Sequence, residues 1–240
     1  MRYLSARHHN GERKMDAERK ITYLKQMELF SSLDNEELFQ VGGKIIVKQF
    51  KKNHTILFKG DTNNYIYIIF DGEVKVSQST EDGKEVILFI HQAGEIFGET
   101  SLVDRGNSPA LIAATKDTFC AIISMKDLYS IMFNYNDILE RLIHILSSRL
   151  CQSWELIQML NSNNAPQRVK TLLMMLAKRY GKNAREETIL NIRLTHQSIA
   201  NMTGLTRETV TRVIDVWQRN GDISTKNKLI QLNPAFMQQN

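Results

Sequence analysis

The sequence between residues 194 and 223 places the tightest constraint on the fold of this 240-residue chain. It reads LTHQSIANMTGLTRETVTRVIDVWQRNGDI, and Gly204 separates two short segments whose apolar residues recur at helical spacing. Thr195 and Thr206 each stand where the N-cap of a helix accepts a backbone N–H. Glycine at the junction allows the tight turn between the two helices. The stretch therefore predicts a helix-turn-helix.

The second predicted helix has one apolar face and one charged face. Its apolar residues follow the spacing i, i+3, i+4, i+7, which buries one side of a helix: Val210, Val213, Ile214 and Trp217. The opposite side carries Arg207, Glu208, Thr211 and Arg212. Arginine pairs bidentately with guanine and glutamate accepts from cytosine. A solvated charged face is the alternative. The sequence GDISTKNKLIQLN that follows predicts a hairpin, which would make the motif winged.

The positive charge of the chain is concentrated in its last third. Residues 165–240 hold 12 Lys and Arg against 5 Asp and Glu, whereas residues 1–164 hold 19 against 21. The balances of +7 and −2 account for the net charge of +5. A basic unit attached to a slightly acidic body indicates a polyanionic partner, most simply nucleic acid. Base reading by the charged helix face is therefore favoured over simple solvation.

Short β-rich runs separated by glycine occupy residues 44–125. The pairs Asp71-Gly72 and Asp82-Gly83 are typical of hairpin turns between strands. Many short strands at regular spacing favour a barrel, a roll or a sandwich. Residues 1–26, by contrast, predict a polar helical extension.

Residues 136–161 form the longest predicted helix. Its seam alternates spacings of four and three, the heptad pattern of a coiled coil, with Ser153 as its polar position: Leu139, Ile143, Leu146, Leu150, Ile157 and Leu160. We expect this helix to pair with the same helix of a second copy and form a homodimer. The alternative is that the stripe packs on the chain's own roll. Pro166 and its neighbours in residues 161–167 then predict a hinge.

Several classes of protein are disfavoured by what the sequence lacks. It has no HExxH, P-loop, GxSxG, CxxC or GxGxxG motif, so we predict no enzyme activity. It has no apolar run of about 20 residues and no secretory signal, so we predict a cytoplasmic protein that does not enter a membrane. Cys120 and Cys151 suit a reducing compartment. We expect both thiols to be buried, with a disulfide between subunits at Cys151 as the alternative.

These features together resemble the CRP/FNR family of bacterial transcription regulators, over about residues 27–233. The resemblance implies an α+β chain with a cyclic-nucleotide-binding-type β-roll, a long dimerisation helix and a C-terminal winged helix-turn-helix. It also implies double-stranded DNA, RNA polymerase and a small-molecule effector as partners. We divide the chain into a helical extension, an effector-sensing roll, a dimerisation helix with its hinge, and a DNA-binding domain: residues 1–26, 27–135, 136–164 and 165–240.

The segment TRETVTR, residues 206–212, resembles the recognition helix of the catabolite activator branch of that family. There, the residues that match Arg207, Glu208 and Arg212 read a TGTGA half-site. We expect contacts to the DNA backbone from residues at the starts of the two helices: Thr195, His196, Gln197, Thr206, Thr209 and Thr211.

The segment FGETSLVDRGNSPALIAA, residues 97–114, resembles the phosphate-binding cassette of the family. The expected effector residues are Gly98, Glu99, Thr100, Ser108, Pro109 and Ala110, with Ser153 and Trp154 on the long helix. The family pattern has Arg-Ser where this chain has Ser108-Pro109, and burying a phosphate without its arginine costs several kcal/mol. Arg105 in the loop is the one substitute nearby, and Trp154 stands where adenine would lie. We therefore expect an effector other than cAMP; a cAMP-responsive regulator is the alternative.

Haem or redox sensing is a further alternative. An iron–sulfur cluster of the FNR type needs four thiolates, which two cysteines cannot supply, so we expect no such cluster and no metal site. A haem needs an axial ligand, for which His54, His91 and His144 are the candidates outside the DNA-binding region. Each of them is more simply explained as an ordinary hydrogen-bonded histidine.

Overall fold

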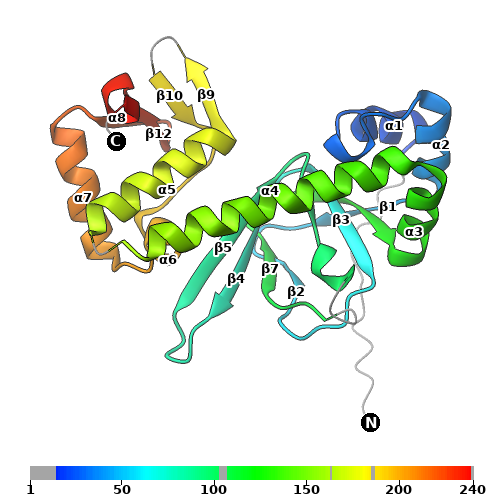
Figure 1. The fold of residues 1–240 in the computed structure, drawn as a ribbon, viewed down its shortest axis with the longest axis horizontal. Coiled ribbons are helices and arrows are strands. Elements are labelled where there is room, and N and C mark those ends of the chain that lie inside the picture. The colour runs from blue at the N-terminus through cyan, green and yellow to red at the C-terminus, as the bar shows by residue number, and fades with distance from the viewer. Residues whose placement is uncertain (1–14, 103–106, 163, 185–186, 239–240) are drawn as a thin grey trace. The chain divides into compact units, whose positions relative to one another are not determined.

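A computed structural model describes residues 15–102, 107–162, 164–184 and 187–238 of the chain. Its contacts divide it into two compact units. The first contains the residues up to Gln78 together with Leu88–Leu146, and the second contains Ser79–Ile87 together with the residues from Ser147 onward. The predicted α+β class is confirmed, with an N-terminal roll, a long helix and a C-terminal helix-turn-helix (Figure 1).

The first unit begins with short helices and continues in strands. The helices are α1 (Ala17–Lys25), the 3-10 turn η1 (Glu28–Phe30) and α2 (Asn35–Gly43). The strands are β1 (Ile46–Phe50), β2 (Thr55–Leu57), β3 (Tyr65–Asp71), β4 (Glu73–Ser79), β5 (Glu85–Gln92), β6 (Ile96–Phe97), β7 (Leu111–Ala114) and β8 (Thr118–Ser124). A second 3-10 turn, η2 (Glu99–Leu102), follows β6, and α3 (Met125–Asn134) follows β8.

These strands form two four-stranded sheets, of order β1-β8-β3-β6 and β2-β7-β4-β5. Alternate side chains of β3 enter two different cores. Ile66 and Ile68 pack in a cluster with residues of the surrounding helices, and Tyr67 and Ile69 pack in a cluster that includes residues of the second sheet. A strand buried on both faces needs a continuous apolar run, which the sequence YIYIIF supplies.

One helix of 25 residues, α4 (Asn136–Leu160), runs on from the first unit into the second. Its bounds agree with the predicted helix to within one residue. Ile138 and Leu142 are buried in the core of the first unit. The helix has apolar residues on more than one face, because the heptad positions other than Leu146 are distinct from those that pack on this core.

The second unit carries the helix-turn-helix. Its elements are α5 (Ala165–Tyr180), β9 (Gly181–Ala184), β10 (Glu187–Leu190), α6 (His196–Thr203), α7 (Arg207–Arg219), β11 (Ile223–Lys226), β12 (Leu229–Leu232) and α8 (Pro234–Gln238). The hairpin predicted after the second helix is β11–β12, in a sheet of order β11-β12-β10-β9. Buried apolar side chains of α5, α6, α7 and α8 form the core of the unit: Val169, Leu173, Ile199, Val210, Ile214 and Phe236.

Two local predictions are wrong. The hinge predicted over residues 161–167 is shorter, because the Asn164 side chain caps α5 and Pro166 stands in its first turn, so the helix already begins at Ala165. Cys151 is exposed rather than buried, since it lies on a face of α4 that the described residues leave uncovered. Cys120 is buried in β8 as predicted, and burial raises the pKa of its thiol.

Candidate DNA-reading helices and ligand cavity

Two capped helices and a left-handed turn form the helix-turn-helix. The Thr195 hydroxyl accepts from the backbone N–H of Ser198 at 3.0 Å, and the Ser198 hydroxyl accepts from the backbone N–H of Thr195 in return. Gly204 ends α6 with φ +67°, a conformation that favours glycine. The Thr206 hydroxyl then caps α7 by accepting from the N–H of Thr209 at 3.2 Å. Each predicted cap and the predicted turn are therefore confirmed.

The first turns of α7 present the predicted base-reading side chains to solvent. Arg207, Glu208 and Arg212 are all exposed. Val210 and Ile214, on the other side of the same helix, are buried at 0% and 2% exposure. Because the apolar side is fixed in the core, the orientation of the charged side is fixed as well. The structure thus brings the three charged residues together on one free face.

The residues predicted to contact the DNA backbone lie at the start of α6 and in the first turns of α7. Thr195 and Gln197 are exposed at the start of α6. His196 is half-buried, and its Nδ1 lies 2.8 Å from Thr211 Oγ1, which joins α6 to α7. The Thr211 hydroxyl also donates to the carbonyl of Arg207 at 2.9 Å. Thr206 and Thr209 share a hydroxyl contact of 3.0 Å at the start of α7.

The β11–β12 hairpin adds basic residues that sequence reasoning did not single out. Lys226 and Lys228 are exposed at its tip, where Asn227 and Lys228 have φ of +53° and +64°. A turn with two consecutive positive φ values matches the twist of a two-residue hairpin. The sequence does contain a signal for them, because both lysines lie in the predicted hairpin of the basic region, residues 165–240.

The roll encloses a cavity of about 130 Å³. It is lined by residues of β4, β5, β6, η2 and β7 and of the segments beside them: Val76, Gln78, Leu88, Phe89, His91, Phe97, Gly98, Glu99, Thr100, Ser108, Pro109, Ala110 and Ile112. No lysine or arginine is among these described residues. Gly98 has φ +87°, and a Cβ there would lie 2.9 Å from the carbonyl oxygen of Tyr65. Glycine is therefore required at the point where the chain turns around the cavity.

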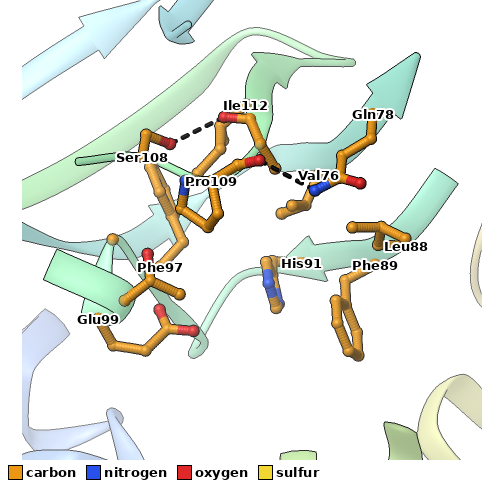
Figure 2. A pocket seen from close by; sticks show the side chains of 13 residues that line it. Val76, Gln78, Leu88, Phe89, His91, Phe97, Glu99, Ser108, Pro109 and Ile112 are labelled. Atoms are coloured by element: carbon orange, nitrogen blue, oxygen red, sulfur yellow. Dashed lines mark hydrogen bonds between the residues drawn. The ribbon is translucent and has the colours of Figure 1, made fainter. Parts of the chain in front are cut away.

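Polar groups in the cavity wall are held by neighbouring groups. The Ser108 hydroxyl donates to the Ala110 carbonyl at 2.8 Å, and Gln78 Nε2 donates to the Pro109 carbonyl at 2.9 Å (Figure 2). His91 is 2% exposed, and its Nδ1 lies 3.3 Å from Glu95 Oε2. Figure 2 shows its ring beside that of Phe89, with which it stacks at 5.9 Å, while Glu99 projects from across the cavity.

Phe97, which lines the cavity, packs against a second aromatic ring. The rings of Tyr67 and Phe97 stack with their centroids 4.7 Å apart. Burial of Tyr67 raises its pKa to about 12. The Phe97 side of the cavity is therefore packed against a buried aromatic ring.

Both regions match known protein families. The cyclic nucleotide-binding domain matches residues 47–135, and the Crp-like helix-turn-helix domain matches residues 167–239. A CRP-like cAMP-activated global transcriptional regulator of Mycobacterium tuberculosis is 30% identical over 188 residues, which cover 78% of this chain and 83% of that protein. The chain belongs to the CRP/FNR family of transcription regulators.

Other members of the CRP/FNR family are similar over most of the chain. The global nitrogen regulator of a Synechocystis species is 29% identical over 197 residues, covering 81% of this chain and 88% of that protein. Among solved structures, FixK2 from Bradyrhizobium japonicum superposes with a TM-score of 0.69 at 20% identity, covering 80% of this chain and 95% of that one. A mutant of CooA from Carboxydothermus hydrogenoformans superposes with a TM-score of 0.70 at 22% identity, covering 80% of this chain and 84% of that one. These two structures support the fold.

Most residues predicted for the effector site of this CRP/FNR regulator line the roll cavity: Gly98, Glu99, Thr100, Ser108, Pro109 and Ala110. Ser153 and Trp154 lie on the part of α4 that belongs to the second unit, and their contact with an effector stays a prediction. Ser153 donates to the carbonyl of Arg149 at 2.9 Å, and Trp154 is 60% exposed. Arg105, the predicted substitute for the missing arginine, lies outside the described residues.

The predicted seam of α4 is an exposed apolar stripe. Five of its residues are between 38% and 56% exposed: Leu139, Ile143, Leu150, Ile157 and Leu160. Leu146 is half-buried against the core of the first unit. The described residues of the chain therefore do not cover the stripe.

Sequence reasoning missed the contribution of β4 and β5 to the cavity. Val76 and Gln78 alternate along β4, and Phe89 and His91 alternate along β5, so each pair shares one face of its strand. The sequence offers His91 as a candidate haem ligand but does not indicate that it lines this wall. In the described ranges, no group of three or more His, Cys, Asp or Glu side chains could hold a metal ion. No helix in those ranges is long and apolar enough to cross a membrane.

Proposed function

We propose that this CRP/FNR regulator binds, as a homodimer, a two-fold DNA site that resembles TGTGA-N6-TCACA. The observation that carries the proposal is the exposure of Arg207, Glu208 and Arg212 on the first turns of α7, above a buried apolar face. Arginine and glutamate at these positions match guanine and cytosine edges in the major groove. The protein acts as a regulator rather than an enzyme, in the cytoplasm, with RNA polymerase as its partner in transcription.

The α4 stripe supports the homodimer. Exposed leucine and isoleucine at alternating spacings of four and three are the positions that a parallel helix pair buries. A two-fold dimer also presents two α7 helices to one face of DNA, with half-sites about one helical turn apart. The two-fold symmetry of the site follows from that of the protein.

The effector occupies the roll cavity and is not cAMP. The described lining contains no lysine or arginine, and the Ser108 hydroxyl donates to the Ala110 carbonyl rather than to a ligand. A phosphate that loses its bidentate arginine loses about 1.5–3 kcal/mol of binding. The cavity of about 130 Å³ is also small beside the roughly 300–1,000 Å³ of pockets for drug-sized ligands. A small, weakly charged molecule fits these walls better than a nucleotide or a haem.

Fluorescence anisotropy on a labelled duplex tests the function. We expect the full chain to bind TGTGA-N6-TCACA more tightly than a scrambled duplex of the same composition, by about 10³-fold or more at physiological salt. The salt concentration must be held constant, because backbone contacts make the affinity salt-dependent. Equal affinity for the two duplexes would contradict the proposed half-site.

A further inference from the structure

The tip of the β4–β5 hairpin, Ser79–Ile87, belongs to the same compact unit as the helix-turn-helix. Glu85, the first residue of β5, accepts a hydrogen bond from Asn201 Nδ2 of α6 at 3.0 Å. Both side chains are half-buried. Within the tip itself, the Asp82 carboxylate lies 2.7 Å from the Lys84 ammonium group. Glu85 thus bonds the tip to α6.

Asn201 also bonds to Gln197, which is predicted to contact the DNA backbone. Its Oδ1 accepts from Nε2 of Gln197, one turn earlier on α6, at 2.8 Å. A carboxylate only accepts hydrogen bonds. Glu85 therefore holds the Asn201 amide with its NH2 group toward the hairpin and its oxygen toward Gln197. One N–H of the exposed Gln197 side chain is consequently bonded within the protein.

We propose that Glu85 is a positioning residue that opposes binding of the DNA backbone at Gln197, an inference that rests on the proposed DNA-binding function. Phosphate oxygens accept hydrogen bonds, and the chain of contacts uses one of the two N–H donors of the Gln197 amide. The Glu85 carboxylate is joined to Gln197 through the Asn201 amide.

The first test is the DNA affinity of Glu85→Ala. The full chain is titrated against TGTGA-N6-TCACA and against the scrambled duplex at one salt concentration. We expect Glu85→Ala to bind both duplexes about two- to fivefold more tightly, as for removal of one partly exposed charge interaction. The matched control is Glu81→Ala, which removes an exposed carboxylate from the same tip and should leave the affinity unchanged. No gain for Glu85→Ala, or an equal gain for Glu81→Ala, would overturn the proposal.

The second test asks whether the gain depends on Gln197. Asn201→Ala should reproduce the gain, and a Gln197→Ala background should reduce the effect of Glu85→Ala by at least half. A full gain in that background would show that Glu85 does not act through Gln197. Should Glu85→Ala unfold at a lower temperature than the natural chain, Glu85→Gln carries the test, with a smaller gain expected. If Arg207→Ala loses sequence preference while Glu85 variants have no effect, only this inference fails; if the natural chain binds neither duplex, the proposed function fails.

Discussion

Leu150→Glu should prevent formation of the proposed homodimer. Leu150 lies in the middle of the α4 stripe and is 52% exposed in the single chain. Complete burial of a leucine side chain contributes about 1.5–3 kcal/mol, so covering its exposed half contributes about 1 kcal/mol, or about 2 kcal/mol for the two copies in a dimer. The substitution removes this contribution. It also places two like charges together in an apolar seam, which costs several kcal/mol more.

The total loss is at least about 4 kcal/mol, which raises the dissociation constant of the dimer about a thousandfold. Sedimentation equilibrium over a concentration series measures it. Ser148→Glu is the matched control, because Ser148 is exposed on the same helix, lies outside the seam and acquires the same charge. It should remain dimeric. A Leu150→Glu protein that sediments as a dimer wherever the natural chain does would refute this assignment of the seam.

Three further predictions concern the roll. Titration with cAMP, followed by Trp154 fluorescence, should show no saturable change below about 10 μM, which corresponds to roughly −7 kcal/mol; saturation below that concentration would mean that the missing arginine is not decisive. Gly98→Ala should lower the free energy of unfolding by about 1–3 kcal/mol in thermal denaturation, because φ is +87° and the new Cβ meets the Tyr65 carbonyl; unchanged stability would contradict the tight turn. The pKa of Tyr67 is about 12 when folded and about 10 when unfolded, so its contribution of about 3 kcal/mol is present below pH 10 and is lost as the pH rises to 12. Tyr67→Phe should flatten denaturant-derived stability over that range, and an unchanged slope would speak against the buried phenol.

The helix-turn-helix could be predicted from the sequence because its signals are local. Thr195 and Thr206 cap the helices that directly follow them, and Gly204 is glycine because its own φ is positive. The face of α7 is set by residues three and four apart. None of these features depends on a distant part of the chain, so the sequence alone predicts which face of the motif is charged.

The cavity could be predicted only in part. Gly98, Glu99 and residues 108–110 were found by resemblance, but the face of β4 that meets them depends on its pairing with β7. The hydrogen bond between Glu85 and Asn201 joins residues 116 positions apart. A contact of that kind leaves no periodic pattern, because it depends on how a hairpin tip and a helix meet. The exposure of Cys151 was mispredicted for a related reason, since it depends on which side of α4 remains uncovered.

The most direct test of sequence reading by α7 is the base preference of Arg207→Ala. Binding is measured by anisotropy on the palindrome and on duplexes with each single substitution in the TGTGA half-site, at one salt concentration. We predict a loss of about 1–3 kcal/mol on the palindrome, with preference relaxed at one base position and retained at the others. An equal loss on every duplex, with all base preferences intact, would show that Arg207 contacts only the backbone and would contradict the account.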